Sequence, residues 1–205
     1  GGQIHTGPPY RHPTTSSIMN VTEVIAVGFA LAYLLLAMQQ NRLCWLAAIV
    51  SALLYLLIFA QVQLYMESGL QVVYVVMAVI GWLFWGKNNS EETLPVTTRP
   101  LRFHLTVILG IALGAVVTGS LLATYTDAAR PFVDASTTVA AIVCTWMVTR
   151  KILENWLYWI VINTVSVWLF MDRGLDLTSG LFALYVLLSI AGYVSWRRTL
   201  TTQII

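Results

Sequence analysis

One stretch of the chain, residues 154–163, combines aromatic and amide side chains in an otherwise apolar run. On a helix, Trp156, Trp159 and Asn163 fall at positions i, i+3 and i+7 and therefore share one face. Two flat indole rings and one amide on the same face suit a planar, polar small molecule. In the alternative interpretation, the tryptophans anchor a membrane interface and the asparagine joins neighbouring helices by hydrogen bonding. The rest of the chain has to decide between the two.

The composition indicates a polytopic membrane protein. Of the 205 residues, 58% are hydrophobic and 10% are charged, whereas soluble domains carry about 25% charged residues. The mean hydropathy is +0.77. The net charge of +2 is too small to imply a nucleic-acid partner. Cys44 and Cys144 lie in apolar runs, and we expect them to be small core residues rather than a disulfide or a metal-binding pair.

Seven apolar runs are candidates to cross a bilayer, whose ~30 Å core needs roughly 20 apolar residues. The predicted spans are Val21–Gln40, Leu43–Ala60, Leu70–Gly86, Phe103–Tyr125, Phe132–Thr149, Asn155–Met171 and Thr178–Trp196. Residues 1–20 lack the basic and apolar regions of a signal peptide, and we expect them to form a flexible leader. Residues 197–205 are expected to form a C-terminal tail.

Lysine and arginine divide unevenly between the two faces that seven spans would create. The face that bears the C-terminus carries eight of them, which are Arg42, Lys87, Arg99, Arg102, Arg150, Lys151, Arg197 and Arg198. The other face carries three, which are Arg11, Arg130 and Arg173. Because these residues concentrate on cytoplasmic loops, we expect the N-terminus outside and the C-terminus in the cytoplasm.

The sequence also repeats itself at an offset of 111 residues. The matched pairs are Trp45 with Trp156, Phe59 with Phe170, Ser68-Gly69-Leu70 with Ser179-Gly180-Leu181, Tyr74 with Tyr185, Gly81 with Gly192 and Trp85 with Trp196. Residues 21–86 and 132–196 are therefore predicted to be two three-helix units, joined by a cytoplasmic linker, 87–102, and a connector helix, 103–125. One connector gives both units the same orientation. This parallel 3+1+3 repeat is the arrangement of the SWEET transporters, with a binding site between the repeats.

The absence of central charged residues and of catalytic motifs from the predicted spans argues against several functions. No acidic or basic residue lies near the middle of a span, which disfavours a proton pump or proton symporter, although Na⁺ coupling through backbone carbonyls stays open. The three histidines do not have the spacing of metal ligands, and no nucleophile elbow or phosphate-binding glycine loop occurs. We therefore expect no enzyme activity, no cofactor and no metal.

The repeat is symmetric in its scaffold and asymmetric in its polar residues. At the 111-residue offset, Trp159 takes the place of Ala48 and Asn163 that of Ala52. An asymmetric ligand would require such differences, and sequence drift would also produce them. Gly81 and Gly192 are expected to allow close helix packing.

The tryptophans near the ends of the predicted spans are candidates for an aromatic belt at the membrane interface. Trp82, Trp85 and Trp196 lie near the cytoplasmic ends of their spans, where we expect the aromatic belt of the membrane interface. Trp45 and Trp156 begin spans on the same face, so for them the belt and a ligand site are equally good interpretations.

At these residues the sequence resembles the PnuC family of vitamin transporters. It has the family's W-x-x-W motif at Trp156-Leu157-Tyr158-Trp159, together with the family-like segments 64–74 and 81–85 in the third span. The resemblance covers nearly the whole predicted membrane region. It implies a SWEET-like fold and facilitated diffusion of nicotinamide riboside. Relatives are thought to carry thiamine, riboflavin or deoxynucleosides, so the resemblance leaves the substrate open.

The implied substrate suits the side chains. A pyridinium ring can stack on tryptophan faces through cation–π attraction, and amides can exchange hydrogen bonds with a carboxamide and ribose. The expected substrate-binding residues are Trp156, Trp159, Asn163, Asn155, Gln71, Tyr74, Trp45 and Tyr185.

The resulting hypothesis is a uniporter of the bacterial inner membrane that imports nicotinamide riboside for NAD synthesis by alternating access. Its expected partners are the substrate, membrane lipids and a cytoplasmic kinase that traps the substrate, and a homo-oligomer is compatible with it. The open alternatives are a thiamine or nucleoside carrier on the same scaffold and a non-transporting membrane receptor.

Overall fold

The computed structural model describes residues 13–61, 65–86, 94–126, 130–172 and 176–203. These residues form seven helices, which are α1 (Pro13–Met38), α2 (Cys44–Gln61), α3 (Tyr65–Trp85), α4 (Leu101–Tyr125), α5 (Pro131–Thr149), α6 (Asn155–Asp172) and α7 (Asp176–Gln203). Six of the seven are long and apolar enough to cross a membrane. The prediction of an all-helical membrane protein is confirmed.

Helix α6, which carries the tryptophan and asparagine stretch, is the described helix that does not reach this apolarity. Asn155, Asn163 and Asp172 interrupt its apolar run, and this keeps it below the hydropathy of a typical span. Polar residues in a membrane helix are costly unless they face the protein interior. Asn155 and Asn163 are buried inside the bundle, whereas Asp172 lies exposed at the end of the helix and pairs with Arg130.

Two helix ends differ from the sequence prediction. Helix α1 begins at Pro13, within the segment expected to be a flexible leader, and α7 continues to Gln203, through most of the expected tail. No proline or glycine follows Trp196 to end the helix. The Oγ1 atoms of Thr201 and Thr202 also donate hydrogen bonds to the carbonyls one turn earlier, 3.1 Å away in both cases. The proposed leader residues 1–12 lie outside the described part of the chain.

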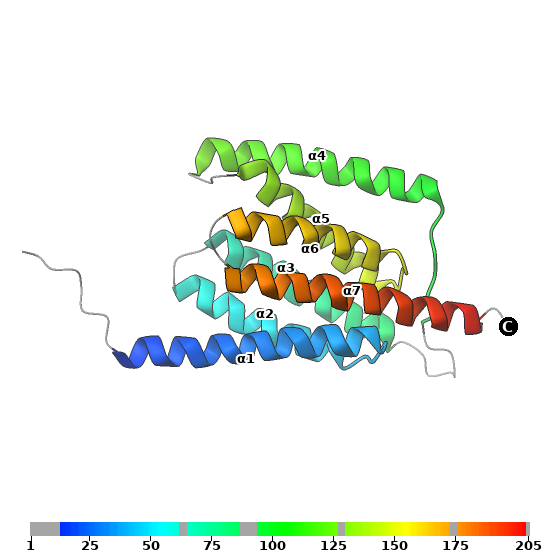
Figure 1. Cartoon of the computed structure of the whole chain (residues 1–205), viewed down its shortest axis with the longest axis horizontal. Coiled ribbons are helices and arrows are strands. Elements are labelled where there is room, and N and C mark those ends of the chain that lie inside the picture. The colour runs from blue at the N-terminus through cyan, green and yellow to red at the C-terminus, as the bar shows by residue number, and fades with distance from the viewer. Residues whose placement is uncertain (1–12, 62–64, 87–93, 127–129, 173–175, 204–205) are drawn as a thin grey trace, which may run out of the picture.

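The described helices run alternately in opposite directions along the chain (Figure 1). The contacts between helices show that six of them close into a ring. Around the ring, each helix packs against the next in the order α1, α2, α3, α5, α6, α7, and α7 packs back on α1. Helix α4 lies outside the ring, where its helix-packing neighbour is α5. We use "C-terminal end" for the end of the bundle at which α1, α3, α5 and α7 finish.

The connections α1–α2 and α5–α6 have a shared backbone feature at the C-terminal end. Gln40 (φ 57°) and Lys151 (φ 48°) adopt the left-handed conformation, which is uncommon for residues with a side chain. The described part of the linker packs on the second of these turns, because Thr97 N donates to Lys151 O (3.0 Å) and Leu153 N donates to Thr97 O (2.8 Å).

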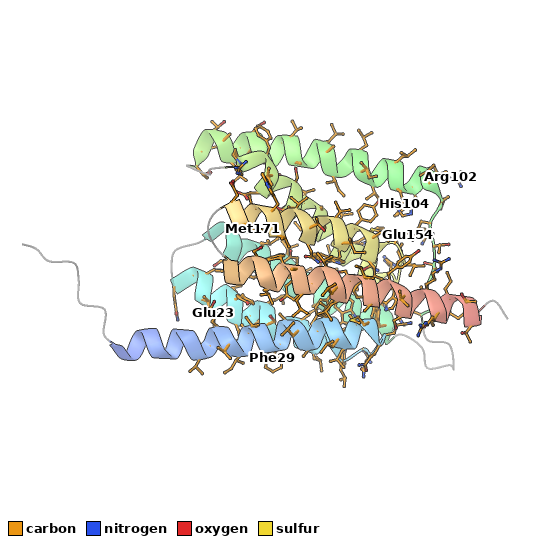
Figure 2. All side chains as sticks on the ribbon, in the orientation of Figure 1. Glu23, Phe29, Arg102, His104, Glu154 and Met171 are labelled. Carbon is orange, nitrogen blue, oxygen red and sulfur yellow. The ribbon has the colours of Figure 1, made fainter. Side chains whose placement is uncertain are left out.

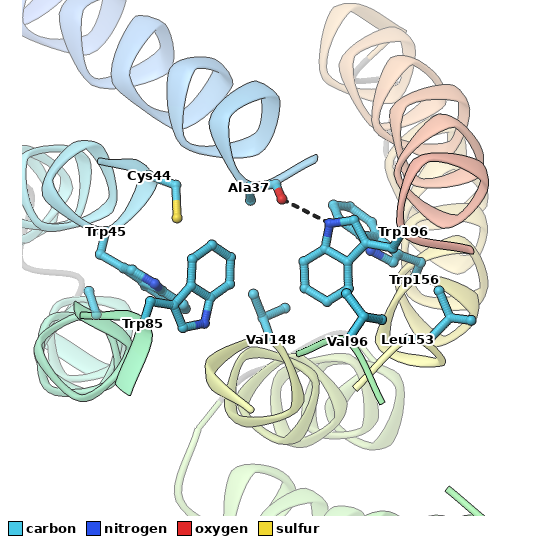
Figure 3. Packing of buried hydrophobic residues seen from close by; sticks show 10 residues of the cluster. Ala37, Cys44, Trp45, Trp85, Val96, Val148, Leu153, Trp156 and Trp196 are labelled. Atoms are coloured by element: carbon cyan, nitrogen blue, oxygen red, sulfur yellow. Dashed lines mark hydrogen bonds between the residues drawn. The ribbon is translucent and has the colours of Figure 1, made fainter. Parts of the chain in front are cut away.

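Four tryptophans form the core at the C-terminal end (Figure 3). The rings of Trp45 and Trp85 meet edge to face at 5.3 Å, and those of Trp156 and Trp196 meet in the same way at 5.4 Å. The expectation that Trp85 and Trp196 belong to an interfacial belt is wrong, since they are 7% and 0% exposed. Closure of the ring brings the ends of α3 and α7 together and buries both indoles. We call these four residues the indole floor.

Small residues make room for this packing. A Cβ atom added at Gly81 would overlap the ring of Trp45, and one added at Gly192 would overlap the ring of Trp156. The predicted role of both glycines in close packing is confirmed. Cys44 and Cys144 are free and fully buried, as expected of small core residues.

Candidate functional site

A cavity of about 280 Å³ lies inside the helix ring, above the indole floor. Its volume is near the lower end of the ~300–1,000 Å³ that small-molecule sites occupy. None of the described residues that line it is charged. Its polar groups are the hydroxyls of three tyrosines, two serines and one threonine, the amide of Asn163 and the indole N–H groups. Such a site suits a small ligand that is flat and neutral, or flat and cationic.

Six of the eight predicted site residues line this cavity, and their role in binding stays a prediction. They are Trp45, Tyr74, Trp156, Trp159, Asn163 and Tyr185. They come from α2, α3, α6 and α7, so ring closure is what brings them together. The helical face shared by Trp156, Trp159 and Asn163 does point to the interior, as their spacing indicates.

The other two predicted residues lie elsewhere. Asn155 is fully buried at the start of α6, where its Nδ2 donates to Ile152 O at 2.6 Å and stabilises the α5–α6 turn. Gln71 is half-buried on α3, one turn before Tyr74, and is not among the residues that line the cavity. Spacing on one helix does not reveal either placement, because both depend on the neighbouring helix.

Most of the cavity wall consists of residue pairs that are 111 positions apart. Two of these pairs keep their residue type, namely Trp45 with Trp156 and Tyr74 with Tyr185. Five pairs differ in type, and they are Leu34/Thr145, Ala37/Val148, Ala48/Trp159, Ala52/Asn163 and Ala78/Ser189. In four of the five, the residue from α1–α3 is aliphatic and its counterpart is polar or aromatic. The first unit therefore provides space, and the second provides most of the groups that can recognise a ligand.

A short hydrogen-bond chain orients the amide of Asn163. Its Nδ2 donates to Ser189 Oγ at 3.3 Å, and Ser189 Oγ donates to Tyr185 O at 2.7 Å. Both side chains are buried, so the bonds satisfy polar groups that would be costly to leave unpaired. The carbonyl oxygen is the acceptor of the Asn163 side chain and can accept a hydrogen bond from a ligand, while Nδ2 keeps a second N–H.

Sequence reasoning missed four polar or aromatic residues of the wall, Tyr33, Ser51, Thr145 and Ser189. For Ser189 a signal existed, since it lies one helical turn after Tyr185 and is the 111-residue counterpart of Ala78. The hydroxyls of Ser51 and Thr145 donate to backbone carbonyls of Ala26 and Ala141, at 3.0 and 2.8 Å. Their oxygens can still accept a bond.

The indole floor separates the cavity from the C-terminal end. Trp45 and Trp156 line the cavity, and Trp85 and Trp196 lie behind them with ring centroids 6.1 Å apart. Trp196 Nε1 donates to Ala37 O at 3.0 Å, which holds α7 against α1 (Figure 3).

Three polar side chains lie at the C-terminal end beside the floor, and we call them the latch. Lys151 Nζ donates to Gln40 Oε1 at 3.3 Å, and Gln40 Nε2 donates to Thr199 Oγ1 at 3.0 Å. The same ammonium lies 4.7 Å over the ring of Trp85. Burial lowers the pKa of Lys151 from its ordinary value, so the charged form is held there at an energetic cost. The latch joins α1, α7 and the α5–α6 turn.

A ring of apolar helices around a small central cavity is the arrangement of a membrane protein that binds a small molecule. The model of the family described as "Nicotinamide mononucleotide transporter" matches residues 20–198. The chain belongs to this family. It is therefore a multi-pass membrane transporter and not an enzyme, as predicted, and the expected inner-membrane location is confirmed.

Individual relatives agree with this assignment. The chain is 28% identical over 174 residues to the Escherichia coli (strain K12) protein named nicotinamide riboside transporter PnuC, covering 72% of this chain and 73% of the relative. It is 28% identical over 168 residues to the protein of the same name from Neisseria mucosa, covering 75% and 63%. In structure it is similar to the crystal structure of the vitamin B3 transporter PnuC, with a TM-score of 0.71, 22% identity, and coverage of 91% of this chain and 88% of that one. The predicted resemblance to the PnuC family is confirmed.

Proposed function

We propose that the chain carries nicotinamide riboside across the membrane, in line with the names of its relatives. The observation that carries this proposal is an uncharged cavity whose α6 wall presents Trp156, Trp159 and Asn163 together. Trp159, which is half-buried at the wall, provides a face for a cationic pyridinium ring, an attraction of ~2 kcal/mol or more in a desolvated site. Trp156 is buried against Gly192 and Trp196 and forms the base of the cavity. The carbonyl oxygen of Asn163 accepts a hydrogen bond from the carboxamide or a ribose hydroxyl.

The uncharged cavity favours nicotinamide riboside over nicotinamide mononucleotide, which is the compound that the family's description names. A phosphate group buried without a cation or several donors loses its hydration and gains no interactions that compensate for the loss. None of the described lining residues is an arginine or a lysine. The buried ammonium of Lys151 lies at the latch and is not among the lining residues.

We further propose that the helices form two parallel repeats, α1–α3 and α5–α7, which rock about the cavity. Geometry at matched positions supports this arrangement. Ser68 Oγ donates to Leu56 O at 3.3 Å, and its counterpart 111 residues later, Ser179 Oγ, donates to Val167 O at 3.1 Å. The edge-to-face tryptophan pairs and the two left-handed residues also match at this offset.

Alternating access then requires the C-terminal end to open, since it is closed by the indole floor and the latch. Exposed arginines lie at this end, on the α4 start and on α7, which supports its placement in the cytoplasm. We propose that breaking the latch lets α1 separate from α7 and releases substrate inward.

Without ion coupling, such a carrier only equalises concentrations. Net uptake would then depend on a cytoplasmic kinase that phosphorylates the substrate for NAD synthesis, and assembly as a homo-oligomer is compatible with this scheme.

The decisive experiment uses the purified chain in liposomes loaded with unlabelled nicotinamide riboside. We expect counterflow of labelled nicotinamide riboside without a proton or sodium gradient. Transport that appears only when a gradient is imposed would contradict uniport. A competition panel of thiamine and nucleosides separates the alternative carriers, and saturable binding without any counterflow would favour a non-transporting receptor.

A further inference from the structure

A second hollow lies on the outside of the ring, between α4 and the α5–α6 pair. It has a volume of about 750 Å³ and walls of mostly aliphatic side chains, such as Ile108, Ile111 and Val161. Within the described part of the chain, the backbone of α4 packs against that of α5 and not against that of α6. The groove between α4 and α6 therefore lies on the outside of the ring, on a face that meets lipid when the helices span a membrane. In a bilayer, an acyl chain is the natural occupant of its apolar length.

Polar groups gather at one end of the groove. His104 Nδ1 and Tyr158 Oη are hydrogen-bonded at 3.0 Å, and His104 Nε2 lies 3.9 Å from Glu154 Oε1. The backbone N–H of Arg99 donates to the same Glu154 oxygen at 3.3 Å. All three side chains line the groove, and Figure 2 shows His104 and Glu154 at the end of the bundle where Arg102 lies.

Two atoms of this cluster lack partners. Glu154 Oε2 and His104 Nε2 are buried and make no hydrogen bond within the described part of the chain. A buried carboxylate oxygen without a donor is costly, and more so than a neutral group. Both atoms belong to residues that line the groove, so a donor group of a molecule bound there can satisfy the carboxylate.

We propose that this groove binds a phospholipid whose headgroup carries a primary ammonium. The acyl chain lies along the aliphatic wall, and the ammonium donates to Glu154. Arg99, two residues before α4, and Arg102, in its first turn, are exposed at the same end and attract the phosphate of the same headgroup. A carboxylate beside two cations complements a zwitterion, whereas an anionic headgroup brings no cation to the carboxylate and is repelled by it. The lipid thereby joins α4 to α6.

The test compares three lipids on the full-length, delipidated chain, namely phosphatidylethanolamine, phosphatidylcholine and phosphatidylglycerol. The ammonium of the first has three N–H donors, the quaternary ammonium of the second has none, and the third has no cation. We expect phosphatidylethanolamine to bind about tenfold more tightly than the others by native mass spectrometry, as a charge-assisted hydrogen bond predicts. Glu154→Gln should reduce its affinity to that of phosphatidylcholine. Glu23→Gln, at an exposed carboxylate of α1, should leave the preference unchanged.

A second measurement does not alter the polar cluster. Val161→Cys places a thiol in the groove, and Val194→Cys places one on an exposed part of α7 outside it. With a photoreactive group on each thiol, we expect Val161→Cys alone to crosslink phosphatidylethanolamine in preference to phosphatidylcholine. Equal binding of the three lipids, tighter binding of phosphatidylglycerol, or an unchanged preference in Glu154→Gln would overturn the proposal. Crosslinking from position 161 to a second copy of the chain would overturn it too.

Discussion

Gln40 and Lys151 are joined by a hydrogen bond of 3.3 Å between the two halves of the chain, although they are 111 residues apart. Both adopt the left-handed backbone conformation, and each lies in the turn that follows the first helix of its half. The bond therefore links equivalent places in the proposed repeats. In the proposed rocking motion of the two halves, it is a contact that opening of the C-terminal end would break.

Replacement of Lys151 by methionine should favour the conformation that is open at the C-terminal end. The variant loses the bond to Gln40 and the cation–π contact with Trp85, and ~1 kcal/mol of net hydrogen-bond energy corresponds to a population shift of about fivefold. The measurement is labelling of Val148→Cys, a buried cavity position, by an impermeant maleimide in inverted vesicles, with both native cysteines replaced by alanine.

The control for this experiment is Arg197→Met, which removes an exposed cation at the same end. It should label like the parent. If Lys151→Met also labels like the parent, the latch does not hold the cavity closed.

Two substitutions in the cavity should weaken binding of nicotinamide riboside without unfolding the chain. Trp159→Ala removes one stacking face, and a loss of ~2 kcal/mol is about a 30-fold rise in Kd. Asn163→Ala removes one hydrogen bond to the ligand and should cost roughly fivefold. Isothermal titration calorimetry measures both. Trp168→Ala, an exposed tryptophan of the same helix, is the matched control, and equal losses in all three variants would argue against the site.

The uncharged cavity predicts poor binding of nicotinamide mononucleotide. Its phosphate would enter a wall with no described cationic side chain, so we expect its affinity to be at least ~100-fold lower than that of the riboside, given the cost of burying unpaired charge. Competition against labelled riboside measures the ratio. Comparable inhibition by the two compounds would show that a cation reaches the ligand.

Two glycines of α7 should respond in opposite ways to alanine. Gly192→Ala forces a Cβ atom into the ring of Trp156 and should lower the Tm of the purified chain, whereas the space around Gly180 is open. Gly180→Ala should leave the Tm unchanged or raise it, because alanine is favoured over glycine in a helix by up to ~1 kcal/mol. A similar Tm for both variants would contradict the tight glycine–indole packing.

A large part of this molecule follows from the sequence alone. Apolar length indicates the seven helices, and helical periodicity places Trp156, Trp159 and Asn163 on one face. The 111-residue offset pairs Trp45 with Trp156 before any contact is known. Six of the eight predicted site residues accordingly meet at one cavity.

Tertiary structure alone decided the remaining features. Periodicity says which side chains share a face, but not which face of another helix they meet, so the cavity excludes Asn155 and Gln71 and includes Ser189. Hydropathy does not distinguish a lipid-facing position from a core position, because lipid and protein core are similarly apolar. The burial of Trp85 and Trp196 depended on ring closure for this reason. Contacts between distant polar residues, from Lys151 to Gln40 and from His104 to Tyr158, exist only once the helices pack.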